Sequence, residues 1–243
     1  MADLTAALHT SVTSLPYPPP APAFIAGLIA ARTPPPPLPA LAATARARLL
    51  AADLTSPATV DVASPAAAAL AFPPGLGAPR EQRLPRDVVV QVLDVEDVAR
   101  ARWAQVEELE ALERGEGTRG RQVVRLPASG GDDDGAGSAP DDRPAPAPTA
   151  GGTHRLVLQD CRGQKVAALE LRRVARIGVG SLHIGEKLVI RAGTVVARGT
   201  VLLEPANCVF LGGKVEPWHK AWVDGRLARL REAVGVSRDG NRG

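Results

Sequence analysis

The sequence predicts a mainly β fold, a small sandwich or barrel with helical additions. Between Thr153 and Gly213, short runs of branched aliphatic residues alternate with turns that contain Gly, Asp, Asn or Pro. Runs of this length and spacing are typical of the strands of small barrels and sandwiches. The expected strands are Leu156–Gln159, Val166–Leu171, Lys187–Arg191, Thr194–Ala197, Val201–Leu203 and Cys208–Leu211.

The alternation within these runs predicts that one face of the sheet is buried and the other is exposed to solvent. Leu156 and Leu158 share one face of their strand, and Leu169 and Leu171 share one face of theirs, because successive side chains of a strand point to opposite sides. Aromatic residues make up only 3% of the chain, so the core is expected to be aliphatic.

Residues 1–80 are predicted to form a small helical element interrupted by proline. Pro20–Ala31 has apolar residues at helical spacing, and Pro34–Pro37 must end any helix there. A second helix is expected from about Pro39 to Asp53, with its leucines on one face. The proline-rich stretch fits a rigid connector or an SH3-type ligand, and we favour the connector.

A link, a strand and a helix are expected next. Asp61–Leu84 is rich in Ala, Pro and Gly and predicts an irregular link, whereas the five valines of Arg86–Val95 predict a strand. Glu96–Arg114 fits a helix with many exposed carboxylates. Its Trp103 is expected to pack this helix against a neighbour, because a lone Trp usually has that role.

The segment before Thr153 is predicted to be a long insertion in two parts. Gly117–Pro127 carries arginines around aliphatic residues and is interpreted as a binding segment. Ala128–Gly152 consists almost entirely of Gly, Ala, Pro, Asp and other small or polar residues, so it cannot offset its ordering entropy and is expected to be disordered. Long loops of this kind are usually functional.

The C-terminal part predicts one more helix. From Glu216 to about Val234, apolar residues line one side, and Pro217 suits a first helical position. We expect this helix to close one end of the barrel. The predicted domains are therefore a helical, Pro-rich element at 1–80, a barrel domain at 81–234 with an insertion at about 115–152, and a disordered tail at 235–243.

Charge is distributed unevenly although its net value is only +3. Residues 153–203 contain nine basic and three acidic side chains, and residues 81–113 contain four basic and nine acidic ones. This pattern fits two surfaces that neutralise each other, and it equally fits a positive face aimed at DNA or at an acidic partner. No apolar run is long enough to span a bilayer and no signal peptide is recognised, so an intracellular protein without a membrane partner is expected.

No catalytic, cofactor or metal site is evident. The four histidines lie without an Asp or Cys at a spacing typical of a nucleophile, base or zinc site, and no phosphate-binding glycine loop occurs. Cys161 and Cys208 are interpreted as reduced, buried small hydrophobes. The sequence therefore predicts a protein that is not an enzyme and holds no cofactor.

Three local patterns carry a family resemblance. They are PLPALAATARARLLAADLT at Pro37–Thr55, the segment Val90–Arg125 before the insertion, and VLLEPANCVFLGGKVE at Val201–Glu216. Together they resemble the RecQ-mediated genome instability protein 1 family, over roughly residues 15 to 232. The third pattern is the most specific, and its structural signature residues are Leu203, Pro205, Asn207, Leu211, Gly212 and Gly213.

The resemblance implies a five-stranded OB-fold barrel behind a small helical element, in a nuclear protein without enzymatic activity. Members of this family bind topoisomerase III, a type IA enzyme, and with a RecQ-type helicase form the complex that dissolves double Holliday junctions. The family's insertion loop, here about Gly115–Gly152, promotes strand passage. Carried onto this sequence, its apolar contacts are Val123, Val124 and Leu126, and its polar or phosphate contacts are Arg119, Arg121 and Arg125.

A second reading of the barrel is a free-standing protein that binds single-stranded DNA. Its basic surplus permits this, but such proteins usually also present aromatic side chains on which bases stack. Residues 153–203 contain no Phe, Tyr or Trp. The sequence therefore favours a barrel that binds protein, with DNA binding that is weak and electrostatic.

Overall fold

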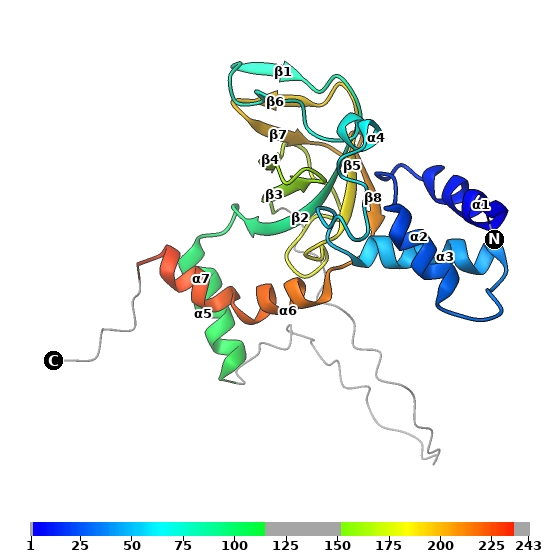
Figure 1. The fold of residues 1–243 in the computed structure, drawn as a ribbon. Helices are drawn as coiled ribbons and strands as arrows, with labels where there is room; N and C mark the ends of the chain where they lie inside the picture. The colour runs from blue at the N-terminus through cyan, green and yellow to red at the C-terminus, as the bar shows by residue number, and fades with distance from the viewer. Residues whose placement is uncertain (1, 115–151, 236–243) are drawn as a thin grey trace, which may run out of the picture. The chain divides into compact units, whose positions relative to one another are not determined.

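The computed structural model describes residues 2–114 and 152–235, and its centre is a curled sheet of eight strands (Figure 1). The sheet order is β1-β6-β7-β4-β3-β2-β5-β8, and β4 with β7 is its parallel pair. The strands are β1 (Glu81–Arg83), β2 (Val88–Asp97), β3 (His154–Asp160), β4 (Lys165–Glu170), β5 (Lys187–Ile190), β6 (Val195–Ala197), β7 (Thr200–Leu203) and β8 (Cys208–Gly212).

The barrel type is as the resemblance implies, but the expected count of five strands is wrong. Two of the extra strands, β1 and β6, pair with each other at one end of the sheet. Another arises because the last barrel strand is broken at Glu204–Asn207 into β7 and β8. Since β7 pairs with β4 and β8 pairs with β5, the two pieces together span the sheet as one strand would.

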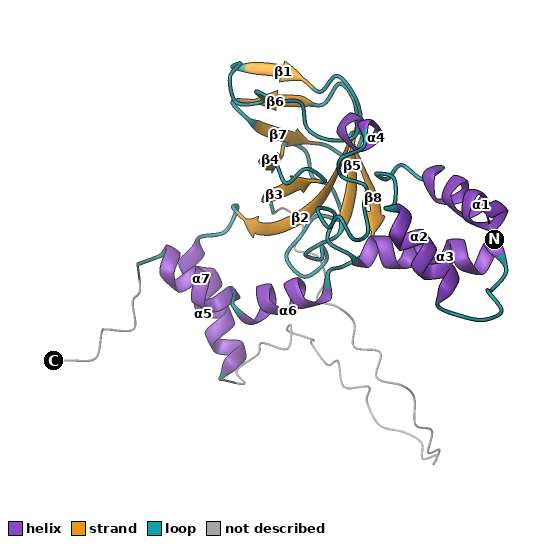
Figure 2. Ribbon diagram, in the orientation of Figure 1, coloured by secondary structure: helices purple, strands orange, loops and turns teal. Residues whose placement is uncertain are grey.

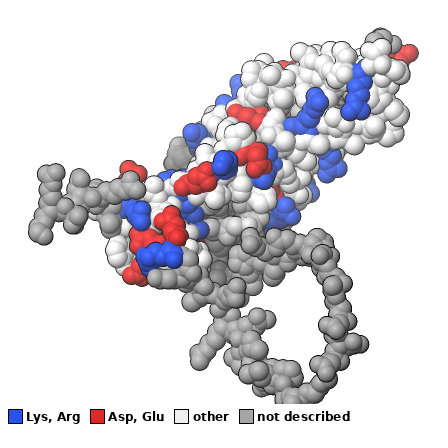
Figure 3. All heavy atoms as spheres, turned by 90° about the horizontal axis from the view of Figure 1, so that it is seen from below, with Lys and Arg blue, Asp and Glu red and all other residues white. Residues whose placement is uncertain are grey.

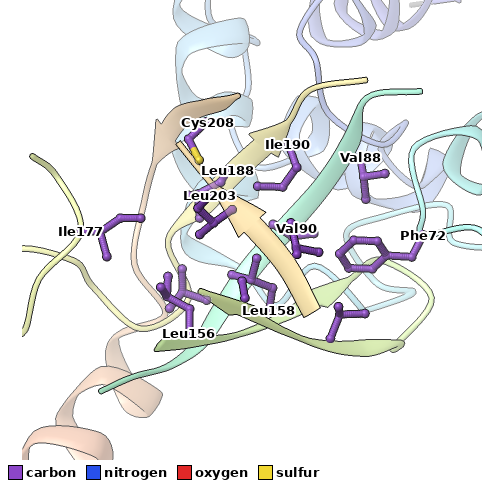
Figure 4. Close-up of a cluster of buried hydrophobic side chains, with 14 of the residues drawn as sticks. Phe72, Val88, Val90, Leu156, Leu158, Ile177, Leu188, Ile190, Leu203 and Cys208 are labelled. Carbon is purple, nitrogen blue, oxygen red and sulfur yellow. The ribbon is translucent and has the colours of Figure 1, made fainter. Parts of the chain in front are cut away.

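The core lies on the concave side of the sheet and is aliphatic, as expected. Alternate residues of β2, β3 and β5 point into it, among them Val90, Leu158 and Leu188, which are fully buried (Figure 4). The predicted common face of Leu156 and Leu158 is thus confirmed as a buried one. Leu169 and Leu171 also share a face, but it is the outer one, and 58% of Leu171 is exposed.

The N-terminal part forms three helices that share a second apolar core (Figure 2). The helices of this part, with a short fourth one that follows, are α1 (Ala2–Thr13), α2 (Pro22–Ala30), α3 (Leu38–Ala51) and α4 (Pro65–Ala69). Proline occupies an early position of α2, α3 and α4, where its missing N–H costs nothing. Val89 and Val189 belong to this core, so the helices pack on the outside of β2 and β5.

The region 61–97 departs from the sequence interpretation in two ways. The expected irregular link contains α4 and the edge strand β1, because Ser64 caps α4 through its hydroxyl and β1 finds its partner β6 far along the chain. The valine-rich strand continues to Asp97, so the helix predicted from Glu96 begins later, as α5 (Arg102–Glu113). Pairing with β3 extends the strand through polar residues that read as helical.

The predicted C-terminal helix is two helices, α6 (Glu216–Asp224) and α7 (Arg226–Ala233), separated at Gly225. Trp218 and Trp222 of α6 pack against the barrel core. The described chain divides after Arg100 and after Arg226 into two compact units, and α7 belongs with α5 in the second. The expectation of one continuous helix as far as Val234 is therefore wrong, and α6 is the helix that packs against the barrel core.

Within the second unit, α5 and α7 pack through a small apolar cluster. Val106 of α5 meets Leu227 and Leu230 of α7, and Arg231 donates two hydrogen bonds to Glu110, at 2.8 and 3.0 Å. Trp103 does not take part: half of it is exposed, and its indole N–H donates to Glu107 of the next turn. The prediction that Trp103 anchors the helix is therefore wrong.

Candidate partner-binding site

The six contact residues predicted in the insertion lie outside the described residues. They are Arg119, Arg121, Val123, Val124, Arg125 and Leu126. What the structure does describe is the pair of strands between which the insertion occurs. β2 and β3 are neighbours in the sheet, and their register continues to the pair Asp97 and His154. Along the chain, α5 and the insertion thus lie between two adjacent strands of the barrel, and β3 begins directly after the insertion.

The strand at the exit of the insertion is held by a buried polar cluster around Glu170. The Glu170 carboxylate accepts a hydrogen bond from the His154 backbone N–H at 2.8 Å and contacts His154 Nδ1 at 2.6 Å. Its other oxygen accepts from Arg173 and from the Val174 N–H, both at 2.9 Å. Because a buried carboxylate must be fully partnered, this cluster fixes the first residue of β3.

The signature residues Leu203, Pro205 and Asn207 occupy the break between β7 and β8. Leu203 is fully buried in the barrel core, and Pro205 is exposed at the turn. The Asn207 side chain bridges two backbone groups of the turn. Its oxygen accepts a hydrogen bond from the Glu204 N–H at 2.8 Å, and its amide donates one to the Leu202 carbonyl at 3.0 Å. Asn207 thus determines where the strand changes its partner.

We expect Asn207→Ala to lower the free energy of unfolding by about 1–2 kcal/mol, because it leaves two backbone groups of the turn without their partner. Urea unfolding followed by circular dichroism measures this loss. Pro205→Ala is the matched control in the same turn, and its exposed ring should change stability by less than about 0.5 kcal/mol. Equal losses in the two variants would contradict the role of the amide.

The other signature residues, Leu211, Gly212 and Gly213, join the barrel to the helical element. Leu211 packs on the helical core from the end of β8. Both glycines have positive φ angles, +85° and +89°. At Gly213 a Cβ would overlap the carbonyl oxygen of Leu50, near the C-terminus of α3. Glycine is therefore needed here for the close approach of two backbones.

Lys187 lies across the same junction and is fully buried. Its ammonium donates to the carbonyls of Leu50 at 2.8 Å, Ala52 at 2.5 Å and Gly185 at 2.7 Å. Two of these carbonyls belong to the end of α3, where backbone acceptors lack helical partners and the helix dipole is negative. Burial lowers the pKa of Lys187 to about 8, and nearby Asp53 opposes the shift.

Gln91 of β2 makes the second polar link to the helical element. Its side-chain oxygen accepts from the Leu54 N–H at 2.8 Å, and its amide donates to Asp53 at 2.7 Å and to Gln159 at 3.1 Å. Gln91 is completely buried. Sequence reasoning missed both Gln91 and Lys187. For Gln91 the signal available was a polar residue at an outward position of an otherwise aliphatic strand.

A shallow hollow of about 370 Å³ lies on the outside of the barrel beside α6. It is lined by Asp53, Thr55, Leu93, Gln159, Lys165, Ile184, Trp218 and Trp222. Trp222 is fixed by a 2.6 Å hydrogen bond from its indole N–H to Asp94. The strands themselves bring no aromatic residue to this surface, but α6 brings two, which the sequence analysis of residues 153–203 did not take into account.

Two histidines fasten α6 to the loop before β5. The rings of His183 and His219 meet edge to face with their centres 4.9 Å apart, and His219 Nδ1 accepts from the Ile184 N–H at 3.3 Å. Burial and the adjacent His183 lower the pKa of His219. Glu216 begins α6 and is paired with Lys214 at 2.6 Å. The Trp pair is therefore held in place from both sides.

The described residues contain neither a metal-binding cluster nor a membrane-spanning helix. Within 2–114 and 152–235, no three or more His, Cys, Asp and Glu side chains gather as a metal would require. None of the described helices is both long and apolar enough to cross a bilayer. Cys161 and Cys208 are free and buried, as the sequence predicted, and burial raises the pKa of each thiol to about 11.

Comparison with known proteins gives matches in both parts of the chain. A family model described as RMI1, N-terminal OB-fold domain, matches residues 72–226, which is more than half of the chain, and one described as RMI1, N-terminal helical domain, matches residues 13–57. The RecQ-mediated genome instability protein 1 of Schizosaccharomyces pombe is 32% identical over 155 residues. That similarity covers 60% of this chain and 63% of the relative.

Proposed function

The chain belongs to the RecQ-mediated genome instability protein 1 family, and on that premise we propose that it is a non-catalytic subunit of a RecQ helicase–topoisomerase III complex. In this role it binds the topoisomerase through its OB barrel. It promotes strand passage, decatenation and the dissolution of double Holliday junctions, and so serves homologous recombination and DNA repair in the nucleus.

The observation that carries the proposal is the OB barrel with an insertion between two adjacent strands. β3 begins directly after the insertion and is fixed by the Glu170 cluster, and its neighbour β2 leads through α5 to the start of the insertion. The hydrogen bonds of Lys187 and Gln91 to the helical element hold the barrel and the helices together. Such a scaffold suits a subunit that positions a loop in its partner and takes no chemical step itself.

We assign the action on the topoisomerase to the insertion, about Gly115–Gly152. Its Val123, Val124 and Leu126 are the proposed apolar contacts. Arg119, Arg121 and Arg125 are the proposed polar or phosphate contacts, since guanidinium groups bind carboxylates and phosphates in a planar, bidentate way. The family resemblance implies that such a loop reaches into the gate of the topoisomerase, and we propose the same place for this one.

Replacing Gly117–Gly152 by a short Gly/Ser linker should leave the barrel folded and the topoisomerase bound, because neither β2 nor β3 is changed. Stimulation of decatenation should fall severalfold. Pull-down with the cognate topoisomerase III and a decatenation assay measure the two properties on the same preparation, and the parent chain is the control. Stimulation that survives unchanged would show that the insertion is not the acting element.

The second candidate function is binding of single-stranded DNA, and Trp218 and Trp222 beside Lys165 favour it. Stacking of bases on aromatic rings next to a cation is how many OB-fold proteins hold single strands. The charge pattern favours weak binding only, since basic and acidic side chains lie next to one another in the view of Figure 3. Titration of the chain with single-stranded DNA over a salt series decides between the two. Tight, salt-dependent binding without topoisomerase binding would reverse the order.

A further inference from the structure

The outer face of β3, β4 and β7 presents a row of aliphatic side chains. Leu156, Ala168 and Leu203 of these strands point into the core, so the residues between them point outward. The register sets Leu169 beside Leu202, and Val157 beside Ala167. Leu171 continues the row one pleat beyond Leu169. The aliphatic stripe, as we name it, consists of Val157, Leu169, Leu171 and Leu202.

The stripe is apolar surface without a partner in the described chain. The helical element packs on the outside of β2 and β5, and α6 packs near Leu93 and Asp94 of β2. None of the three apolar clusters of residues 2–114 and 152–235 includes a residue of the stripe. Leu171 is 58% exposed, and the other three are half-buried. Contiguous apolar side chains that are at least partly exposed mark interaction sites more often than scattered ones do.

The border of the stripe is basic. Arg155 lies directly across from Leu169, and Lys165 lies on the same outer face of β4. Arg172 follows Leu171 and is 77% exposed. Each arginine makes a long ion pair: Arg155 lies 4.0 Å from Glu96, and Arg172 lies 3.9 Å from Glu204. Exposed pairs of this length contribute little, so the arginines can bind other carboxylates.

The chemistry of the stripe fits a protein and not a nucleic acid. No aromatic residue occurs in β3, β4 or β7, so the stripe itself offers bases no ring on which to stack, and Trp218 and Trp222 belong to the hollow beside α6. An aliphatic centre with arginines at its edge is typical of the contact surface between proteins. The basic border is complementary to a partner surface that carries carboxylates around apolar side chains.

The position of the stripe says which partner this is. β3 is the strand at which the chain leaves the insertion, and Arg155 follows His154, the first residue of that strand. Because the insertion ends just before β3, a protein that binds the insertion can also reach the outer face of β3. We propose that the aliphatic stripe docks on an apolar, carboxylate-bordered surface of the topoisomerase, an inference that rests on the proposed function.

The test is a double variant, Leu171→Glu with Leu202→Glu, titrated with the cognate topoisomerase III in solution. The Kd should rise at least tenfold, because two carboxylates replace leucines in a contact that excludes water. Leu112→Glu is the matched control, since Leu112 is a leucine of similar exposure, 56%, in the other compact unit. Its Kd should stay within about twofold of the parent. Circular dichroism and thermal unfolding confirm that each variant is folded.

A second variant keeps the test informative if the leucine variant does not fold. Arg155→Glu with Arg172→Glu changes exposed side chains only, and should weaken binding about tenfold and reduce its dependence on salt. Binding by either folded variant as tight as the parent's would overturn the docking site while leaving the proposed function intact. Loss of single-strand DNA binding with unchanged topoisomerase binding would overturn it too. A parent chain that does not bind the topoisomerase would overturn the proposed function itself.

Discussion

Gly213→Val should lower the free energy of unfolding by about 3 kcal/mol or more, and should separate the helical element from the barrel. A Cβ at this position would overlap the Leu50 carbonyl oxygen and lie 2.8 Å from its carbonyl carbon. These are backbone atoms at the end of α3, so they cannot turn aside as a side chain would. The φ angle of +89° adds a strain that β-branched residues tolerate poorly.

The neighbouring Gly212 separates the two causes. Its φ angle is +85°, but a Cβ there would meet no atom within 4 Å. Gly212→Val should therefore cost only the backbone strain, about 1–2 kcal/mol. Chemical unfolding gives both values, and limited proteolysis of α3 reports whether the helices have come loose. If the two valine variants were equally unstable, the close approach to Leu50 would have no energetic importance.

Lys187→Met should cost about 2–4 kcal/mol at pH 7, the second large effect. The methionine fills a similar volume but donates nothing, so the carbonyls of Leu50, Ala52 and Gly185 lose their buried partner. Urea unfolding measures the loss. Lys165→Met, which changes an exposed lysine of β4, is the control and should leave stability within about 0.5 kcal/mol of the parent.

The stability that Lys187 contributes should also depend on pH. Burial lowers the pKa of Lys187 to about 8 from its usual 10.5. Below pH 8 both folded and unfolded chains carry the proton, and the folded chain bears the full cost of the buried charge. Between pH 8 and 10.5 the unfolded chain alone keeps the proton, so Lys187 contributes stability that increases with pH, by on the order of 3 kcal/mol.

Three other groups make the folded chain less stable as the pH rises over part of this range. Burial raises the pKa of Cys161 and of Cys208 to about 11, and it raises the pKa of Tyr17 as well. Their contributions are lost as the pH rises, because the unfolded chain releases its protons first. The quantity to compare is therefore the difference between parent and Lys187→Met, which should widen from pH 8 to 10. A constant difference would mean that Lys187 keeps its usual pKa.

The sequence predicts most of the barrel because its strands have a local signal. Six aliphatic runs between turn residues fall within one or two residues of β3 to β8, and the valine run marks β2. The helices α2 and α3 are recognisable because proline begins each of them. In these segments the chain's own periodicity and its turn residues agree with the final fold.

What the sequence does not predict depends on contacts between distant segments. β1 exists because it finds β6 more than a hundred residues later, and β2 continues to Asp97 because β3 pairs with it. Trp103 is exposed although a lone tryptophan usually packs. The burial of Lys187 has no local signal at all, since a lysine at the start of a strand is normally in water.

The candidate site divides in the same way. The signature residues are recognisable in the sequence as a motif. Their structural roles depend on contacts: Asn207 binds the Leu202 carbonyl at the strand break, and Gly213 lies against Leu50 of α3. The sequence predicts only part of the aliphatic stripe. It places Leu169 and Leu171 on one face of their strand, but which face is exposed to solvent depends on how the sheet curls. A shift of one residue would exchange the two.

The adjacency of β2 and β3 has a consequence for how this protein can change over evolution. The barrel holds Asp97, where β2 ends, next to His154, where β3 begins, so α5 and the insertion together connect two neighbouring residues of the sheet. Doubling the length of a flexible loop between fixed ends costs only about 0.6 kcal/mol. The insertion can therefore lengthen, shorten or exchange its sequence while the barrel stays as it is.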